Sequence, residues 1–161
     1  MARLLVVGGG CRALALAREL RAEGHAIRQV TRTPARRAEI EAAGAECVVA
    51  TPDRIGSLRY ALDNVTLLLW LLGTATGANV ADLHGSRWAM MLEKTIDTTV
   101  RGVVYEAAGS VPGEVLAEGR RTGERVAGHN EIPLRVLEAD PAGQEAWIAA
   151  ARAAIDALLA A

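Results

Sequence analysis

Blocks of apolar residues, separated by amphipathic stretches, run through almost the whole chain. The apolar blocks predict six short strands, at residues 4–7, 26–31, 46–50, 65–72, 102–106 and 134–137. The stretches between them predict helices at residues 12–23, 34–43, 55–62, 86–98, 114–126 and 142–160. Strands that alternate with helices in this way form a parallel sheet covered by helices on both faces. The sequence therefore predicts an α/β fold of three layers.

The turn after the first predicted strand is the most informative segment. It reads Gly8-Gly9-Gly10-Cys11-Arg12-Ala13 and leads directly into a helix, which is the G-x-G-x-x-A pattern of a dinucleotide-binding turn. Gly8 permits a tight turn, Gly10 lets a pyrophosphate approach the backbone, and Ala13 keeps helix and strand close. The phosphates would bind the free N–H groups at the start of the helix. The competing interpretation is an ordinary strand-to-helix turn that holds no ligand.

This turn also sets the expected topology. It predicts a doubly wound parallel sheet, the Rossmann fold, with about six strands in the order 3-2-1-4-5-6. We expect residues 1–161 to form a single NAD(P)-binding domain. Ligands of such sheets bind at the C-terminal ends of the strands, near the crossover between the first and fourth strands.

The end of the second predicted strand indicates which dinucleotide is bound. NAD-preferring sites carry an acidic residue there that accepts from the ribose 2′-hydroxyl, but this chain has Arg32 between two threonines. A guanidinium suits a 2′-phosphate, and Arg12 adds a second positive charge, so we expect NADP(H) rather than NAD(H). NAD(H) remains the alternative, with Arg32 as a plain surface residue. Asp53 follows the third strand, where it either contacts the adenine amino group or caps the next helix.

Composition and charge exclude several other classes of protein. The 161 residues are 51% hydrophobic and carry a net charge of −1, which argues against a nucleic-acid partner, although Arg is abundant and Lys94 is the only lysine. The chain begins without the pattern of a secretory signal, and its longest apolar run, 65–72, is too short to span a membrane. Cys11 and Cys47 lack the spacing of metal ligands, so we expect no metal and a cytoplasmic location.

The chain resembles the short-chain dehydrogenase/reductase superfamily, on its extended and atypical side with the NAD-dependent epimerase/dehydratase-like proteins. The resemblance rests on residues 4–17, 24–34, 43–46, 71–73 and 102–106. It implies a nicotinamide dinucleotide across the strand ends, with phosphates at the glycine turn, adenine at Asp53 and the ribose nearest the nicotinamide at Leu72-Gly73. The predicted cofactor-binding residues are Gly8, Gly10, Cys11, Arg12, Ala13, Arg32, Thr33, Asp53, Leu72 and Gly73.

Two departures from that superfamily bear on function. Its catalytic Tyr-x-x-x-Lys is missing, because Tyr60 is followed by Asn64 and Tyr105 by Gly109. A single helix after the sixth strand also leaves out the substrate-binding part of extended members. We therefore expect a dinucleotide-binding or sensing module. One alternative is a small NADP(H)-dependent oxidoreductase or epimerase-like enzyme with a non-standard proton donor and a small-molecule substrate. Another is a Rossmann-like domain that binds a different nucleotide or none.

Three further residues are candidates for chemistry at the predicted mouth. His84 follows the fourth strand and either serves as an acid or base or packs locally. Cys11 is either a reactive thiol at a helix N-terminus or a small residue that fills the turn. Glu106 is a base, a ribose contact or the partner of a nearby arginine. The helix at 86–98 is a candidate subunit contact, since the superfamily often forms homodimers.

Overall fold

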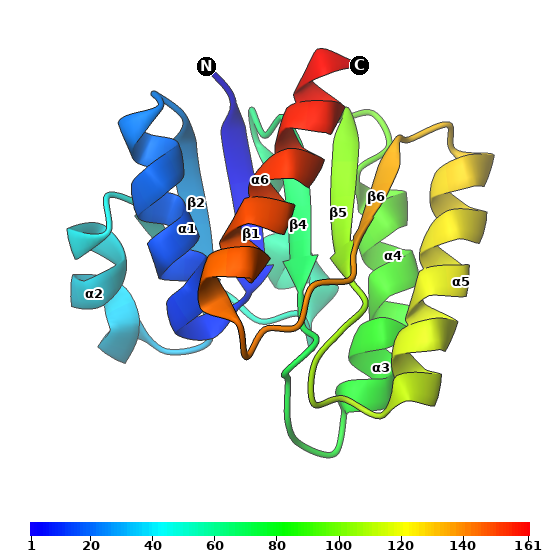
Figure 1. The fold of residues 1–161 in the computed structure, drawn as a ribbon. Coiled ribbons are helices and arrows are strands. Elements are labelled where there is room, and N and C mark those ends of the chain that lie inside the picture. The colour runs from blue at the N-terminus through cyan, green and yellow to red at the C-terminus, as the bar shows by residue number, and fades with distance from the viewer.

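The computed structural model describes the whole chain, residues 1–161, and shows a six-stranded parallel sheet between two layers of helices (Figure 1). The strands are β1 (Arg3–Gly8), β2 (Ala26–Thr31), β3 (Glu46–Val49), β4 (Leu67–Leu71), β5 (Gly102–Glu106) and β6 (Leu134–Leu137). The α-helices are α1 (Gly10–Ala22), α2 (Arg37–Ala42), α3 (Val80–His84), α4 (Ser86–Lys94), α5 (Gly113–His129) and α6 (Gln144–Ala160). The sheet order is β3-β2-β1-β4-β5-β6, which confirms the predicted Rossmann topology.

The largest differences from the predicted elements lie around the fourth strand. Residues 55–62 form two short 3₁₀ segments, η2 (Ile55–Leu58) and η3 (Tyr60–Leu62), rather than one helix. Helix α3 was not predicted, because it has five residues and no side-chain cap at its start. Helix α4 ends at Lys94, four residues earlier than expected, and the turn that follows contains Asp97 at φ +63°, which a right-handed helix cannot include.

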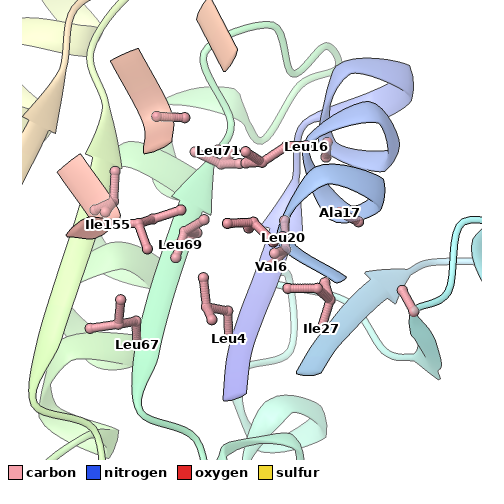
Figure 2. Close-up of a cluster of buried hydrophobic side chains, with 14 of the residues drawn as sticks. Leu4, Val6, Leu16, Ala17, Leu20, Ile27, Leu67, Leu69, Leu71 and Ile155 are labelled. Carbon is pink, nitrogen blue, oxygen red and sulfur yellow. The ribbon is translucent and has the colours of Figure 1, made fainter. Parts of the chain in front are cut away.

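Two hydrophobic clusters of similar size, 21 and 20 buried residues, show that both faces of the sheet are covered. On one face, Leu16 and Leu20 of α1 pack toward Val6 of β1 and Leu69 of β4, and Ile155 of α6 joins them (Figure 2). On the other face, residues from η2, η3 and α3–α5 pack against the opposite side of the strands. All five residues of β4 are buried, which confirms its prediction as a central strand covered on both faces.

The C-terminal ends of the strands form the lower edge of the sheet in Figure 1. The first turns of α1 and α6 meet this edge, and so do the connections that follow β4 and β5. Strand β1 pairs with β2 on one side and with β4 on the other, so the direction of winding reverses between β1 and β4. No helix of the structure has both the length and the apolar character needed to cross a bilayer.

Candidate functional site

The three glycines between β1 and α1 each adopt a positive φ, but for different reasons. A Cβ on Gly8 (φ +86°) would lie 2.3 Å from the carbonyl oxygen of Leu71, so only glycine lets β1 end this close to β4. A Cβ on Gly9 would lie 2.5 Å from the Cβ of Ala13, which makes this pair the close contact between turn and helix. Gly10 (φ +54°) has no atom within 4 Å of its Cβ position. The space over Gly10 is therefore open, at the point where a phosphate would approach.

The start of α1 presents unused backbone donors to this open space. The first backbone bond at this end runs from Ala13 N–H to the carbonyl of Gly9, and no side chain caps the helix. The N–H groups before Ala13 have no carbonyl one turn earlier in the helix to bond. Cys11 is exposed in this first turn, and its thiol is free. The arrangement suits an anion, because the N-terminus of a helix carries a partial positive charge.

A cavity of about 240 Å³ adjoins the glycine turn on the β2 side. It is bounded by residues of four segments that meet at the sheet edge: Val7, Gly8, Val30, Thr31, Arg32, Thr33, Arg36, Pro52 and Leu72. Val7, Val30, Pro52 and Leu72 are the apolar residues of this lining, and Arg32 and Arg36 are its charged residues. The cavity therefore has the composition of a site for a flat, polar-edged group that bears a negative charge.

Arg32 lines this cavity and pairs with Asp53, which follows the lining residue Pro52 in the chain. The Arg32 Nη1 donates to Asp53 Oδ2 at 2.5 Å, and the Arg32 side chain is 54% exposed. Asp53 also accepts from Thr51 Oγ1 at 3.1 Å, and it caps no helix, because the residue before η2 is Arg54. Thr33 caps the next turn by accepting from Ala35 N–H at 3.2 Å. The helix-capping alternative for Asp53 is therefore wrong, and Arg32 is held at the cavity mouth.

Arg12 lies on the other side of the glycine turn, in a buried ion pair with Glu106. Its Nη2 donates to both carboxylate oxygens, at 2.9 Å and 3.2 Å, and its Nη1 donates to Thr74 Oγ1 at 3.3 Å. Its guanidinium carbon lies 5.1 Å from the ring centre of Trp147. Glu106 is fully buried and also accepts from the Trp147 indole N–H at 2.7 Å and from Gly73 N–H at 2.8 Å. Of the roles considered for Glu106, the structure shows the ion pair with an arginine.

Leu72 and Gly73 lie on opposite sides of the crossover. The Leu72 side chain lines the cavity beside Gly8. Gly73 is buried against the connection after β5, since its Cβ would lie 2.0 Å from the carbonyl oxygen of Ala108. All ten predicted cofactor-binding residues lie at or soon after the C-terminal ends of β1–β4, which are neighbours in the parallel sheet, and Ala13 is buried.

His84 is buried within the fold and does not face the mouth. Its Nε2 faces the Leu72 carbonyl at 2.9 Å, and its Nδ1 lies 2.6 Å from the Tyr105 hydroxyl. Because a carbonyl only accepts, Nε2 carries the proton and Nδ1 accepts from Tyr105. Burial lowers the pKa of His84, and burial together with the neighbouring Glu106 charge raises the pKa of Tyr105. The local-packing alternative for His84 is the one that the structure shows.

Sequence reasoning missed two residues that support the site. Gln29, buried in β2, donates from Nε2 to the Gly8 carbonyl at 3.0 Å and so fixes the first glycine of the turn. The only indication in the sequence of this role of Gln29 is that a polar residue lies within a predicted strand. Trp147 lies in the last predicted helix, and nothing in the local sequence indicates its bond to Glu106, which lies 41 positions earlier. The structure brings no group of three or more His, Cys, Asp or Glu side chains together as metal ligands.

No protein-family model matches the sequence, and no curated protein matches it. Solved structures do match the fold. The UDP-glucuronic acid 4-epimerase of Bacillus cereus in complex with NAD aligns over 84% of this chain and 56% of its own, with 13% identity and a TM-score of 0.64. The Citrobacter sp. triphenylmethane reductase complexed with NADP(H) aligns over 84% and 48%, with 19% identity and a TM-score of 0.62. Vestitone reductase from alfalfa aligns over 84% and 56%, with 12% identity and a TM-score of 0.64.

These identities establish a shared fold. The chain spans about half the length of the three proteins, which are an epimerase and two reductases. The aligned part is the Rossmann sheet with its flanking helices, since it covers most of the present chain.

Proposed function

We propose that this protein is a binding or sensing module for a nicotinamide adenine dinucleotide, with NADP(H) preferred over NAD(H). The observation that carries the proposal is the open space over Gly10, at the uncapped start of α1 and beside a cavity on the β2 side. Gly8 and Gly9 allow close packing against β4 and α1, whereas a Cβ on Gly10 would meet no atom beyond its chain neighbours and the nearby backbone of its own helix. At the start of α1, where backbone N–H groups lack helical partners, a positive φ with open space beside it suits a ligand that approaches the backbone.

The residues present fit the adenosine and diphosphate half of such a ligand. The N–H groups at the start of α1 would bind the diphosphate. The cavity bounded by Val30, Pro52 and Leu72 would take the adenosine, and Arg32 at its rim would meet a 2′-phosphate. The likeness to an NAD-bound epimerase and an NADP(H)-bound reductase supports the same ligand class. When bound, a nicotinamide dinucleotide supplies hydride chemistry at its ring.

The burial and hydrogen bonding of the candidate acids and bases favour a binding role over an enzymatic one. Glu106 is fully buried in an ion pair, and both ring nitrogens of His84 are engaged inside the core. Tyr105 is also buried, and Lys94 is exposed at the end of α4. None of these groups stands free at the edge where the dinucleotide would lie.

The substitution Gly10→Ala tests the proposal. Its methyl group would enter the open space over the turn, so we expect the affinity for NADPH, measured by isothermal titration calorimetry, to fall at least ~10-fold, or about 1.4 kcal/mol. The strain of alanine at positive φ also lowers the free energy of unfolding by about 1–2 kcal/mol.

Gly24→Ala is the matched control, because Gly24 also has a positive φ (+92°), open space at its Cβ position and a place at the far end of α1. We expect it to lose similar stability and to keep full affinity for NADPH. Equal affinities for the wild type and Gly10→Ala would contradict the proposed site.

A further inference from the structure

We propose that the protein recognises only the phosphorylated adenosine half of the dinucleotide and leaves the nicotinamide half outside the fold. The ligand class is then any adenosine 5′-diphosphate that carries a 2′-phosphate, with or without nicotinamide. This inference rests on the proposed function, because it places the adenosine half in the cavity beside Gly8.

A dinucleotide normally lies across both halves of a Rossmann sheet. Each half, three strands with their connecting helices, holds one mononucleotide, and the crevice at the crossover joins them. In this protein the adenosine half corresponds to the ends of β1–β3 and the nicotinamide half to the ends of β4–β6. The two halves differ in what occupies their C-terminal edge.

Protein side chains fill the edge over β4 and β5. The Arg12 side chain leaves α1 next to the glycine turn and reaches Glu106 at the end of β5. There it bonds Thr74 and stacks over Trp147 at the start of α6. We name these four residues, Arg12, Thr74, Glu106 and Trp147, the Arg12–Glu106 cluster. It joins α1, α6, the end of β5 and the connection after β4.

The backbone closes the same half of the edge. A Cβ on Gly73 would lie 2.0 Å from the Ala108 carbonyl, and one on Gly109 would lie 2.1 Å from the Gly73 carbonyl. Val111 N–H donates to the Gly73 carbonyl at 3.0 Å. The connections after β4 and β5 are therefore in direct contact, and no space for a ring and a ribose separates them.

The two halves also differ in how readily they can open. Glu106 is fully buried and accepts four hydrogen bonds from three donor groups, so a ligand that withdrew Arg12 would leave an uncompensated carboxylate, which is strongly unfavourable. Arg32 is 54% exposed and its partner Asp53 25% exposed, so that surface pair exchanges for a phosphate at little cost. The adenosine half is thus accessible to a ligand, whereas the buried Arg12–Glu106 ion pair keeps the nicotinamide half closed.

Two consequences follow for binding. The oxidised and reduced cofactors differ only in the nicotinamide ring, so they should bind with equal affinity. The protein would then respond to the amount of 2′-phosphorylated adenine dinucleotide and not to its redox state.

A ligand series with the wild-type protein tests the inference by isothermal titration calorimetry. The ligands are NADP⁺, NADPH, 2′-phospho-ADP-ribose, which lacks nicotinamide, and nicotinamide mononucleotide. We expect the first three to bind within ~3-fold of one another and the mononucleotide to give no binding heat. A loss of ~10-fold or more for 2′-phospho-ADP-ribose, or a ~10-fold difference between NADP⁺ and NADPH, would overturn the inference. Failure of all four ligands would refute the proposed function itself.

The fluorescence of bound NADPH gives an independent readout. A nicotinamide ring that stays in water keeps the emission maximum and lifetime of free NADPH, and that is the expected result. A blue-shifted emission with a longer lifetime would show a ring buried in the protein and would overturn the inference.

Discussion

At the scale of the residue, His84 shows how burial decides what a titratable side chain can do. The imidazole donates to a backbone carbonyl through Nε2 and accepts from the Tyr105 hydroxyl through Nδ1. Both bonds suit the neutral ring, and burial lowers the pKa of His84 below its ordinary value of 6.5. Histidine after a central strand is a common catalytic candidate, but here it holds α3 against β5.

This lowered pKa predicts a loss of stability in mild acid. Below about pH 6.5 the unfolded chain binds a proton at His84 more readily than the folded chain, so the free energy of unfolding falls as the pH falls. The slope is at most about 1.4 kcal/mol per pH unit, and it ends when the pH reaches the pKa of the folded state. Urea unfolding between about pH 7.5 and about pH 5, above the range in which most carboxylates titrate, measures the effect.

His84→Gln should remove that slope, because glutamine can donate to Leu72 and accept from Tyr105 without titrating. His129→Gln, at an exposed position in α5, serves as the control and should leave the slope unchanged. Identical pH profiles for the wild type and His84→Gln would show that His84 does not carry the pH dependence.

The two arginines predicted at the phosphate site show what sequence can and cannot indicate about a residue. Position alone placed Arg32 and Arg12 at the correct edge of the sheet, because both follow strands whose ends are fixed by the fold. The partner of Arg12 is 94 positions away, and only the packing of α6 on the sheet brings Glu106, Trp147 and Arg12 together. The spacing of residues close together in the sequence does not indicate contacts between residues this far apart in the chain.

At the scale of the element, two glycines of α5 allow this helix to pack closely against the aromatic side chains of β5 and α4. A Cβ on Gly119 would lie 1.9 Å from the Tyr105 hydroxyl oxygen, and one on Gly123 would lie 2.9 Å from the Trp88 indole nitrogen. The sequence pattern predicts a helix here although glycine has a low helix propensity. Both glycines let α5 approach the stacked rings of Tyr105, Trp88 and Trp70. The two glycines therefore lower the intrinsic helix propensity of α5 but allow closer packing of the helix on the core.

Gly119→Ala should lower stability for this reason. The added methyl group must displace either α5 or Tyr105, and overpacking of a core costs about 1–3 kcal/mol, which exceeds the gain of about 1 kcal/mol in helix propensity. Gly128→Ala, in the same helix with open space at its Cβ position, should instead gain up to about 1 kcal/mol. Urea unfolding measures both changes, and a Gly119→Ala variant as stable as Gly128→Ala would contradict this packing.

Short elements were the hardest to predict. Helix α3 and the two 3₁₀ segments have three to five residues each, so they show no periodicity, and tertiary contacts hold them. In α3, Leu83 is buried and its carbonyl accepts from the Trp70 indole N–H at 3.0 Å. Such contacts exist only once the sheet has formed.

At the scale of the whole molecule, the alternation of strands and helices predicts a parallel sheet, and the glycine turn after the first strand predicts the order of its strands. That order brings the glycine turn, the end of β2 and the connection after β3 to one edge. It also brings the Arg12–Glu106 cluster to the neighbouring half of the same edge. The molecule thus combines one accessible half of the sheet edge, proposed above for adenosine, with a second half that protein side chains fill.

The central claim is that the accessible half binds a 2′-phosphorylated adenine dinucleotide through the glycine turn and Arg32. The most direct test is isothermal titration calorimetry of the wild type and Arg32→Ala with NADPH and with NADH. Arg37→Ala is the control, since Arg37 is exposed in the same segment and does not line the cavity. We predict that the wild type and Arg37→Ala bind NADPH at least ~10-fold more tightly than NADH, and that Arg32→Ala binds the two alike. Equal affinity of the wild type for both dinucleotides, or no binding of either, would contradict the account.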